Sequence, residues 1–167
     1  MRHIGYYSLQ ASKLVGHSGT VIAVEPNPPT AAALRRNIAL NGFTNIKMHE
    51  VACTAGVEQG IGVTGIKLDS ILNSERLQRL DLVKIDVEGA EILLLRGMND
   101  SLIAFHPKLI LELKADALSN LGSSLEEVFA WLHERGYSRA ENLEEDDSLW
   151  VPDPRNRKGA SGERVHE

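Results

Sequence analysis

The stretch LDLVKIDVEGAEILLLRG, residues 80–97, combines an apolar run with charged residues at alternate positions. Its first half is typical of a buried strand, because aliphatic residues cluster there before a turn signal. Lys84, Asp86 and Glu88 nevertheless share one face of that strand, since successive side chains point to opposite faces. An apolar helix-like run follows immediately after Gly89. The stretch therefore predicts a strand that ends in an acidic turn and leads directly into a helix.

Strands and helices are predicted to alternate on both sides of this stretch. The expected strands are residues 20–26, 45–53, 81–88 and 107–114, and helices are expected at 5–16, 27–42, 90–98 and 125–136. Asn27 can cap the second helix, and Ser123 with Glu126 matches a capping box before the last one. Residues 66–72 are expected to form a short strand or turn. The alternation predicts an α/β fold with a mostly parallel sheet covered by helices.

Two further strands are expected near the end of the chain, at residues 137–143 and 148–152. The acidic turn between them is too short for a crossover helix, so we expect an antiparallel edge hairpin. Residues 1–153 are predicted to form one domain, which is long enough to bury a substantial core. Residues 154–167 contain almost nothing to bury, so this tail is expected to be disordered.

Composition narrows the class of protein. The net charge of -5 argues against a broad nucleic-acid surface, which needs clustered lysines and arginines. The single cysteine excludes an internal disulfide. No apolar run approaches the ~20 residues that span a bilayer, and the start of the chain lacks the apolar segment of a secretory signal. We expect a cytoplasmic protein without a membrane span or nucleic-acid partner.

Acidic residues fall at the predicted carboxyl ends of several strands, where open α/β sheets bind their ligands. Glu25 follows one strand and either accepts the hydroxyls of a nucleotide ribose or is a solvated acid that precedes a helix. Asp86 and Glu88 follow another strand, and Glu112 interrupts the run 107–114.

Lys84 inside a strand is costly unless it is paired. We therefore expect Lys84, Asp86, Glu88 and Glu112 to form a partly buried charge cluster, which is either a functional site or a structural ion-pair network. The six histidines show no ligand spacing. Cys53 is expected to be a small core residue rather than a nucleophile.

The blocks VIAVEPNP (21–28), LDLVKIDVEGAEILLLRG (80–97) and PKLILEL (107–113) together resemble the FkbM-type methyltransferases. The similarity runs from about Ile4 to Leu113, and KIDVEGAE is its most specific part. The family consists of S-adenosylmethionine-dependent enzymes, mostly O-methyltransferases. The resemblance implies a Rossmann-like class I methyltransferase fold with strand order 3-2-1-4-5-7-6 and an antiparallel last strand.

The resemblance also implies roles for individual residues. Glu25 would bind the ribose diol of S-adenosylmethionine, Pro26 and Asn27 would shape the loop beside it, and the backbone at Ala52 and Cys53 would border the adenine.

In the same way, Asp86 and Glu88 would face the methyl group and the incoming acceptor, with Lys84 as their counter-ion. Asp86 would accept the proton of a hydroxyl on a small molecule, sugar or lipid. A divalent cation on Asp86, Glu88 and Glu112 is the alternative, although we expect no metal.

The beginning of the chain departs from the family pattern. Only IGYYS (4–8) remains of the first strand and its glycine-rich loop, so Gly5 corresponds to the final glycine of that loop. We expect the absence of that strand either to leave backbone groups of the central sheet unpaired or to make its two neighbours pair directly. Residues 53–71 also look compressed, as if a strand were lacking there.

Three hypotheses follow. The chain is an N-terminally truncated methyltransferase domain that is weak or inactive, or a minimal complete methyltransferase that dimerises across exposed strand edges. The third hypothesis is a non-catalytic Rossmann-like module that binds a nucleotide or another protein. A nicotinamide-dependent enzyme is less favoured than these three.

Overall fold

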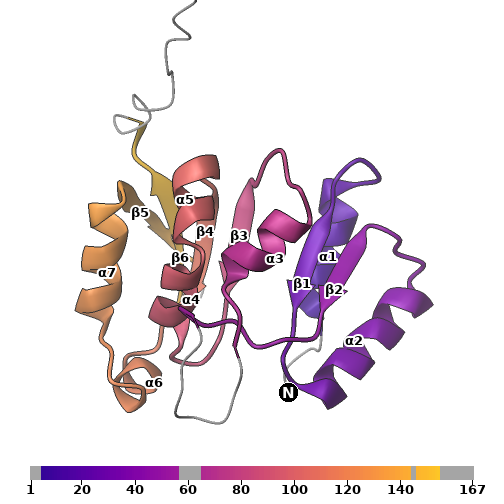
Figure 1. The fold of residues 1–167 in the computed structure, drawn as a ribbon, viewed down its shortest axis with the longest axis horizontal. Helices are drawn as coiled ribbons and strands as arrows, with labels where there is room; N and C mark the ends of the chain where they lie inside the picture. The colour runs from indigo at the N-terminus through magenta and orange to yellow at the C-terminus, as the bar shows by residue number, and fades with distance from the viewer. Residues whose placement is uncertain (1–4, 57–64, 144–145, 155–167) are drawn as a thin grey trace, which may run out of the picture. The chain divides into compact units, whose positions relative to one another are not determined.

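The computed structural model of the chain describes residues 5–56, 65–143 and 146–154. The chain divides into two compact units (Figure 1): residues 1–53 with 57–66, and residues 54–56 with 67–167. The predicted disordered tail lies outside the described residues beyond Pro154, as does Ile4. The single domain over residues 1–153 stays a prediction. In the part of the chain that is described, no helix has the length and apolar character needed to cross a membrane.

The first unit consists of two helices and two parallel strands, namely α1 (Tyr6–Val15), β1 (Val21–Val24), α2 (Pro28–Leu40) and β2 (Ile46–His49). Val21 of β1 lies opposite Ile46 of β2. The start of α2 agrees with the sequence prediction, because the Asn27 side chain accepts a hydrogen bond from the Thr30 backbone N–H at 3.1 Å. The start of this helix is therefore defined by residues close to it in the sequence.

Asn45 connects α1 to the beginning of β2. Its Nδ2 donates to the carbonyl oxygens of Gly16 at 2.9 Å and Ser12 at 3.2 Å. The buried Ser12 hydroxyl in turn donates to Asn45 Oδ1. Buried polar groups are stable only when they are hydrogen-bonded, so this contact fixes the carboxyl end of α1 against the two strands.

The second unit contains a mixed four-stranded sheet in the order β3-β4-β6-β5 (Figure 1). β3 and β4 are parallel, whereas β6 runs antiparallel to both β4 and β5. Its elements are α3 (Leu68–Ser74), β3 (Leu82–Ile85), α4 (Glu91–Gly97), α5 (Asn99–Phe105), β4 (Lys108–Glu112), α6 (Ala115–Asn120), α7 (Leu125–Glu134), β5 (Tyr137–Asn142) and β6 (Asp147–Pro152). The predicted antiparallel edge hairpin is confirmed.

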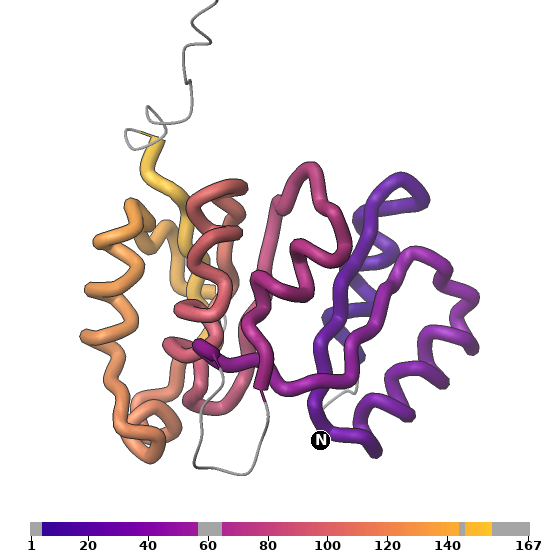
Figure 2. The backbone as a smooth tube through the Cα atoms, in the orientation of Figure 1, coloured from indigo at the N-terminus to yellow at the C-terminus, as the bar shows by residue number. Residues whose placement is uncertain are grey.

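The core of this unit lies between the sheet and its helices. Figure 2 follows the backbone through the two consecutive helices α4 and α5 before it enters β4. Leu109 and Leu111 of β4 and Leu95 of α4 are completely buried. Burial of each such side chain stabilises the fold by roughly 1.5–3 kcal/mol. Tyr137 is also buried, and its hydroxyl donates to the Pro107 carbonyl oxygen at 2.9 Å.

The expectation of a strand or turn at residues 66–72 is wrong, because Leu68–Ser74 forms helix α3. Leu68, Ile71 and Leu72 have helical spacing and are buried. Asp69 is buried too, and its carboxylate accepts hydrogen bonds from the backbone N–H groups of Asp100 at 3.0 Å and Ser101 at 2.9 Å. These hydrogen bonds join α3 to the start of α5.

The two sheets reproduce two parts of the strand order implied by the resemblance. β2-β1 corresponds to 3-2, and β3-β4-β6-β5 corresponds to 4-5-7-6. No strand in the described ranges corresponds to number 1. Direct pairing of its two neighbours, one of the two alternatives expected, is not found there, because β1 pairs with β2 and β3 pairs with β4.

Candidate active site

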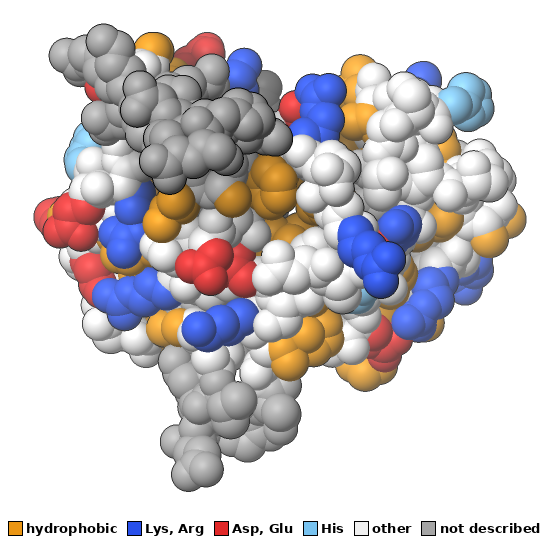
Figure 3. Space-filling model, turned by 45° about the horizontal axis from the view of Figure 1, so that its top comes forward, with side chains coloured by type: hydrophobic (Ala, Val, Ile, Leu, Met, Phe, Trp, Pro, Cys, Tyr) orange, Lys and Arg blue, Asp and Glu red, His pale blue; other side chains and the backbone are white. Residues whose placement is uncertain are grey.

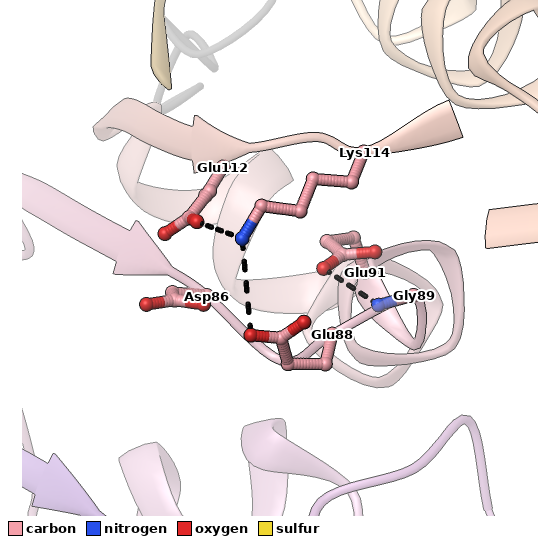
Figure 4. A pocket seen from close by; sticks show the side chains of 6 residues that line it. All are labelled: Asp86, Glu88, Gly89, Glu91, Glu112 and Lys114. Atoms are coloured by element: carbon pink, nitrogen blue, oxygen red, sulfur yellow. Dashed lines mark hydrogen bonds and ion pairs between the residues drawn. The ribbon is translucent and has the colours of Figure 1, made fainter. Parts of the chain in front are cut away.

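The carboxyl ends of β3 and β4 bring several acidic side chains to one small hollow in the second unit (Figure 4). The residues lining it are Asp86, Glu88, Gly89, Glu91, Glu112 and Lys114. Parallel strands end at the same edge of a sheet, which places Asp86 after β3 beside Glu112 at the end of β4. The side chains fill the hollow, and its enclosed volume is about 0 Å³.

Lys114 occupies the space between two of these acids. Its Nζ lies 2.5 Å from Glu112 Oε1 and 3.9 Å from Glu88 Oε1 (Figure 4). The hydrogen bond with Glu112 raises the pKa of Lys114. Lys114 is therefore a charged partner that the sequence analysis did not include in the site.

Glu112 interacts with Asp86 as well as with the lysines. The hydrogen bond from Lys114 is the largest of the effects that lower the pKa of Glu112, and burial opposes it. A side-chain hydrogen bond with Asp86 and the charge of Lys84 lower this pKa further. Asp86 and Glu112 are thus neighbouring carboxyl groups at the ends of adjacent parallel strands, and we refer to them as the carboxyl pair.

The turn after β3 has an unusual backbone. Glu88 has φ 54° and Gly89 has φ 101°, both in the left-handed region that favours glycine. The Gly89 N–H donates to Glu91 Oε1 at 3.0 Å. Glu91 is 1% exposed, and its Oε2 has no hydrogen-bond partner among the described residues. Glu91 therefore stabilises the turn that carries Asp86 and Glu88.

Lys84 has its closest acidic partner on a different strand from the one expected. Its Nζ pairs with Asp147 at the start of β6 and lies 3.9 Å from Glu112 Oε2. The side chains of Lys84, Asp147 and Glu112 are 16%, 18% and 22% exposed. The lysine thus links the hairpin to the strand-end acids, although it does not line the hollow.

The residues expected at the nucleoside lie in the first unit. Glu25 directly follows β1, and its Oε1 accepts a hydrogen bond from the Asn27 N–H at 2.8 Å. Pro26 and Asn27 are exposed beside it. Ala52 and Cys53 come after β2, where the Ala52 carbonyl accepts from the Ile66 N–H at 2.9 Å. Since β1 and β2 are parallel, these residues share the carboxyl-end edge of their sheet.

Gly5 caps α1 in the same unit. Its φ is 79°, and a Cβ at this position would lie 2.4 Å from Leu34 Cδ1 of α2. The glycine therefore allows both the turn into α1 and the close approach of α2.

The structure brings together Asp86, Glu88 and Glu112, with Lys84 joined to them through Glu112. Glu25 and Asp86 belong to different units, so a pocket shared by them stays a prediction. Within the described ranges, no group of three histidine, cysteine or acidic residues is arranged to hold a metal ion.

Sequence reasoning missed Lys114, Asp147 and Glu91. The alternation Glu112-x-Lys114 was the available signal for Lys114.

Comparison with solved structures identifies the fold as that of class I methyltransferases. The chain is similar to the methyltransferase FkbM of Methylobacillus flagellatus KT, with a TM-score of 0.63 and 19% identity over 89% of this chain and 40% of that one. It is also similar to a SAM-dependent methyltransferase of Aquifex aeolicus, with a TM-score of 0.53 and 15% identity over 89% of this chain and 76% of that one. The chain thus spans two fifths of the length of the first protein.

The sequence profile described as "Methyltransferase FkbM domain" matches residues 54–139, just over half of the chain. The protein therefore belongs to the FkbM methyltransferase family. The match includes all the residues that line the strand-end hollow. Comparison with curated protein sequences gives no significant match.

Proposed function

We propose that this chain is an S-adenosylmethionine-dependent methyltransferase domain that methylates a hydroxyl oxygen of a small molecule, sugar or lipid. The observation that carries the proposal is the placement of the carboxyl pair, Asp86 and Glu112, in one hollow at the ends of adjacent parallel strands. The family and the fold support the reaction class, and this pair supports a hydroxyl as the methyl acceptor.

The carboxyl pair is suited to accept a proton. Methylation of an alcohol forms a carbon–oxygen bond and releases the hydroxyl proton. Asp86 is the member of the pair that follows β3 directly, and its carboxylate is the proposed acceptor of that proton. Lys114 and Lys84 favour the ionised form of Glu112, so a negative charge remains in the hollow beside Asp86.

The residues of the first unit fit the methyl donor. The Asn27 N–H orients the Glu25 carboxylate through Oε1, and Oε2 makes no hydrogen bond to another described residue. An oriented carboxylate with an available oxygen can accept a ribose hydroxyl. When bound, S-adenosylmethionine supplies an electrophilic methyl group. Holding the acceptor oxygen in line with that methyl group supplies much of the rate acceleration.

Isothermal titration calorimetry with S-adenosylhomocysteine tests the donor site. We expect binding to the full chain and at least about tenfold weaker binding to Glu25→Ala, since a charge-assisted hydrogen bond contributes roughly 1.5–3 kcal/mol. Glu141→Ala, an exposed acid of β5, is the matched control and should bind normally. Absence of binding to the unmodified chain would contradict the proposal.

The base is tested by single-turnover conversion of S-adenosylmethionine with a panel of sugar and lipid alcohols. For an alcohol that is methylated, Asp86→Asn should lower the rate of the chemical step by about 10²–10⁴-fold without changing affinity for S-adenosylhomocysteine. An unchanged rate would show that Asp86 is not the general base.

One observation favours a second function, a non-catalytic Rossmann-like binding module. The strand-end hollow has an enclosed volume of about 0 Å³ because Lys114 and the acids fill it. A module of this kind would give no turnover with any alcohol and would bind S-adenosylhomocysteine, NAD or neither ligand. Calorimetry with both nucleotides, combined with the turnover assay, separates the two functions.

A further inference from the structure

A second hollow lies among the helices of the second unit. It is open to solvent, has a volume of about 250 Å³ and is lined by Lys67, Asp69, Arg96, Asn99, Asp100, Trp131 and Arg135. None of these residues lines the strand-end hollow. Glu91 and Arg96 belong to opposite ends of the short helix α4, so the two hollows are separated along that helix.

Arg135 is held in a fixed orientation in this hollow. Its guanidinium carbon lies 3.6 Å from the centre of the Trp131 ring. Nε donates to Asn99 Oδ1 at 2.8 Å, and Nη1 donates to the Trp131 carbonyl oxygen at 3.1 Å and to the exposed Glu134 Oε2 at 3.5 Å. Nη2 makes no hydrogen bond to another residue in the described ranges. A guanidinium that is already ordered loses little side-chain entropy when it binds an anion.

Two more cations line the same hollow. Lys67 is exposed, and no acidic side chain pairs with its ammonium group in the part of the chain that is described. Arg96 is 45% exposed and contacts Glu127 Oε1 through Nη2 at 2.7 Å. That pair is accessible to water, and exposed ion pairs are weak enough for another anion to compete.

The acids of the lining offset only part of this charge. Both oxygens of Asp69 already accept hydrogen bonds, from the Asp100 and Ser101 backbones and from the Ser101 hydroxyl. Asp100 is the second acid. Three cations and two acids leave the lining with a formal charge of +1, whereas the whole chain carries -5. Outside the lining, Glu127 contacts Arg96 and Glu134 contacts Arg135, and both acids are solvent-accessible. On the left of Figure 3, where α4, α5 and α7 lie in Figure 1, lysine and arginine side chains are interspersed with acidic ones.

We propose that this hollow is an oxyanion-binding site that takes the phosphate group of a small ligand. Arg135 supplies an oriented donor at Nη2, Lys67 supplies an ammonium group without an acidic partner among the described residues, and Arg96 supplies a guanidinium that can leave Glu127. A phosphate has several acceptor oxygens and can contact all three cations. The volume equals that of about eight liquid waters, which suits a phosphate with a small attached group.

NMR titration of the ¹⁵N-labelled full chain tests the site, with inorganic phosphate, pyrophosphate and acetate as probes at constant ionic strength. The Trp131 indole N–H and the Arg135 Nε–H report on the hollow, and Trp131→Phe identifies the first signal. We expect both signals to shift and to saturate with phosphate or pyrophosphate, at about 1 mM. Saturation with acetate at the same concentration would instead assign the site to carboxylates and overturn the choice of phosphate.

Four variants separate a specific site from a general charge effect. Lys67→Gln should weaken phosphate binding about threefold and Arg135→Lys about tenfold, because the latter loses the guanidinium fork. Glu127→Gln should strengthen binding about threefold by removing the acid that competes for Arg96. Arg36→Gln, an exposed arginine of α2 in the other unit, should have no effect.

Shifts that do not saturate, or equal affinities for all four variants, would overturn the proposal. Weaker binding to Glu127→Gln would also contradict it. Because no methyl donor or acceptor is present, the result is independent of the proposed methyltransferase activity.

Discussion

A Cβ atom on Gly89 would lie 2.3 Å from the carbonyl oxygen of Ala117, so the turn after β3 packs directly against the backbone of α6. Lys114, which pairs with Glu112 and Glu88, is the N-cap of the same helix. Contact between this turn and α6 therefore places Lys114 beside the turn residue Glu88. The geometry of the hollow depends on a residue that carries no side chain.

Gly89→Ala is expected to destabilise the protein strongly. The substitution adds a backbone clash to the cost of φ 101°, and we expect the free energy of unfolding to fall by more than about 2 kcal/mol in urea denaturation. Gly122→Ala is the control, because Gly122 has φ 75° with nothing within 4 Å of an added Cβ. Gly122→Ala should lower the free energy of unfolding by only about 1–2 kcal/mol. Equal losses in the free energy of unfolding of the two variants would mean that α6 moves away from the added Cβ atom without destabilising the fold.

Lys114→Met should raise the pKa of Glu112, because the hydrogen bond from Lys114 is the main cause of its lowered value. A folded-state pKa below the ordinary 4.5 means that ionised Glu112 stabilises the protein above pH 4.5. This contribution is lost as the pH falls through the folded-state pKa. The stability difference between the unmodified chain and the variant should therefore shrink below pH 4.5.

Carbon-detected NMR titration of the glutamate carboxyl groups measures this pKa directly. Lys108→Met, which removes an exposed lysine from β4, should leave it unchanged. An unaltered Glu112 titration in Lys114→Met would show that the ammonium group does not interact with this carboxylate in solution.

Lys84→Met should leave the carboxylate of Asp147 partly buried without its lysine. We expect a loss of about 1–3 kcal/mol in the free energy of unfolding at neutral pH. Adding Asp147→Asn should recover part of this loss, and a double-mutant cycle should give a coupling energy of roughly 1 kcal/mol. Strictly additive losses would contradict a direct interaction between the two side chains.

Cys53 should react slowly with iodoacetamide. Burial raises the pKa of its thiol above the ordinary value of 9.0, and the thiolate is the reactive form. Alkylation followed by mass spectrometry should show a rate that still increases above pH 9.0 and that rises when urea unfolds the chain. Rapid alkylation of the folded protein at neutral pH would contradict the interpretation of Cys53 as a packing residue.

The sequence predicted the elements that short-range signals define. Asn27 caps α2 as expected, and the closely spaced strands β5 and β6 form the predicted hairpin. Where two local signals compete, the sequence prediction failed. The cap of α7 is Ser124, which accepts from the Glu127 N–H at 3.2 Å, rather than the predicted Ser123. Adjacent serines offer similar caps, and packing of the helix selects between them.

By itself, the sequence determined that acids follow β1 and β3 and that Lys84 needs a partner, because side-chain alternation and hydrogen bonding act within a few residues. Only the tertiary structure decided that the partners of Lys84 include Asp147 and Glu112 and that Lys114 lies between Glu112 and Glu88. Asp147 is 63 residues from Lys84 along the chain. Charges so far apart in the sequence meet through the order and register of β3, β4 and β6, which depend on the packing of the whole sheet.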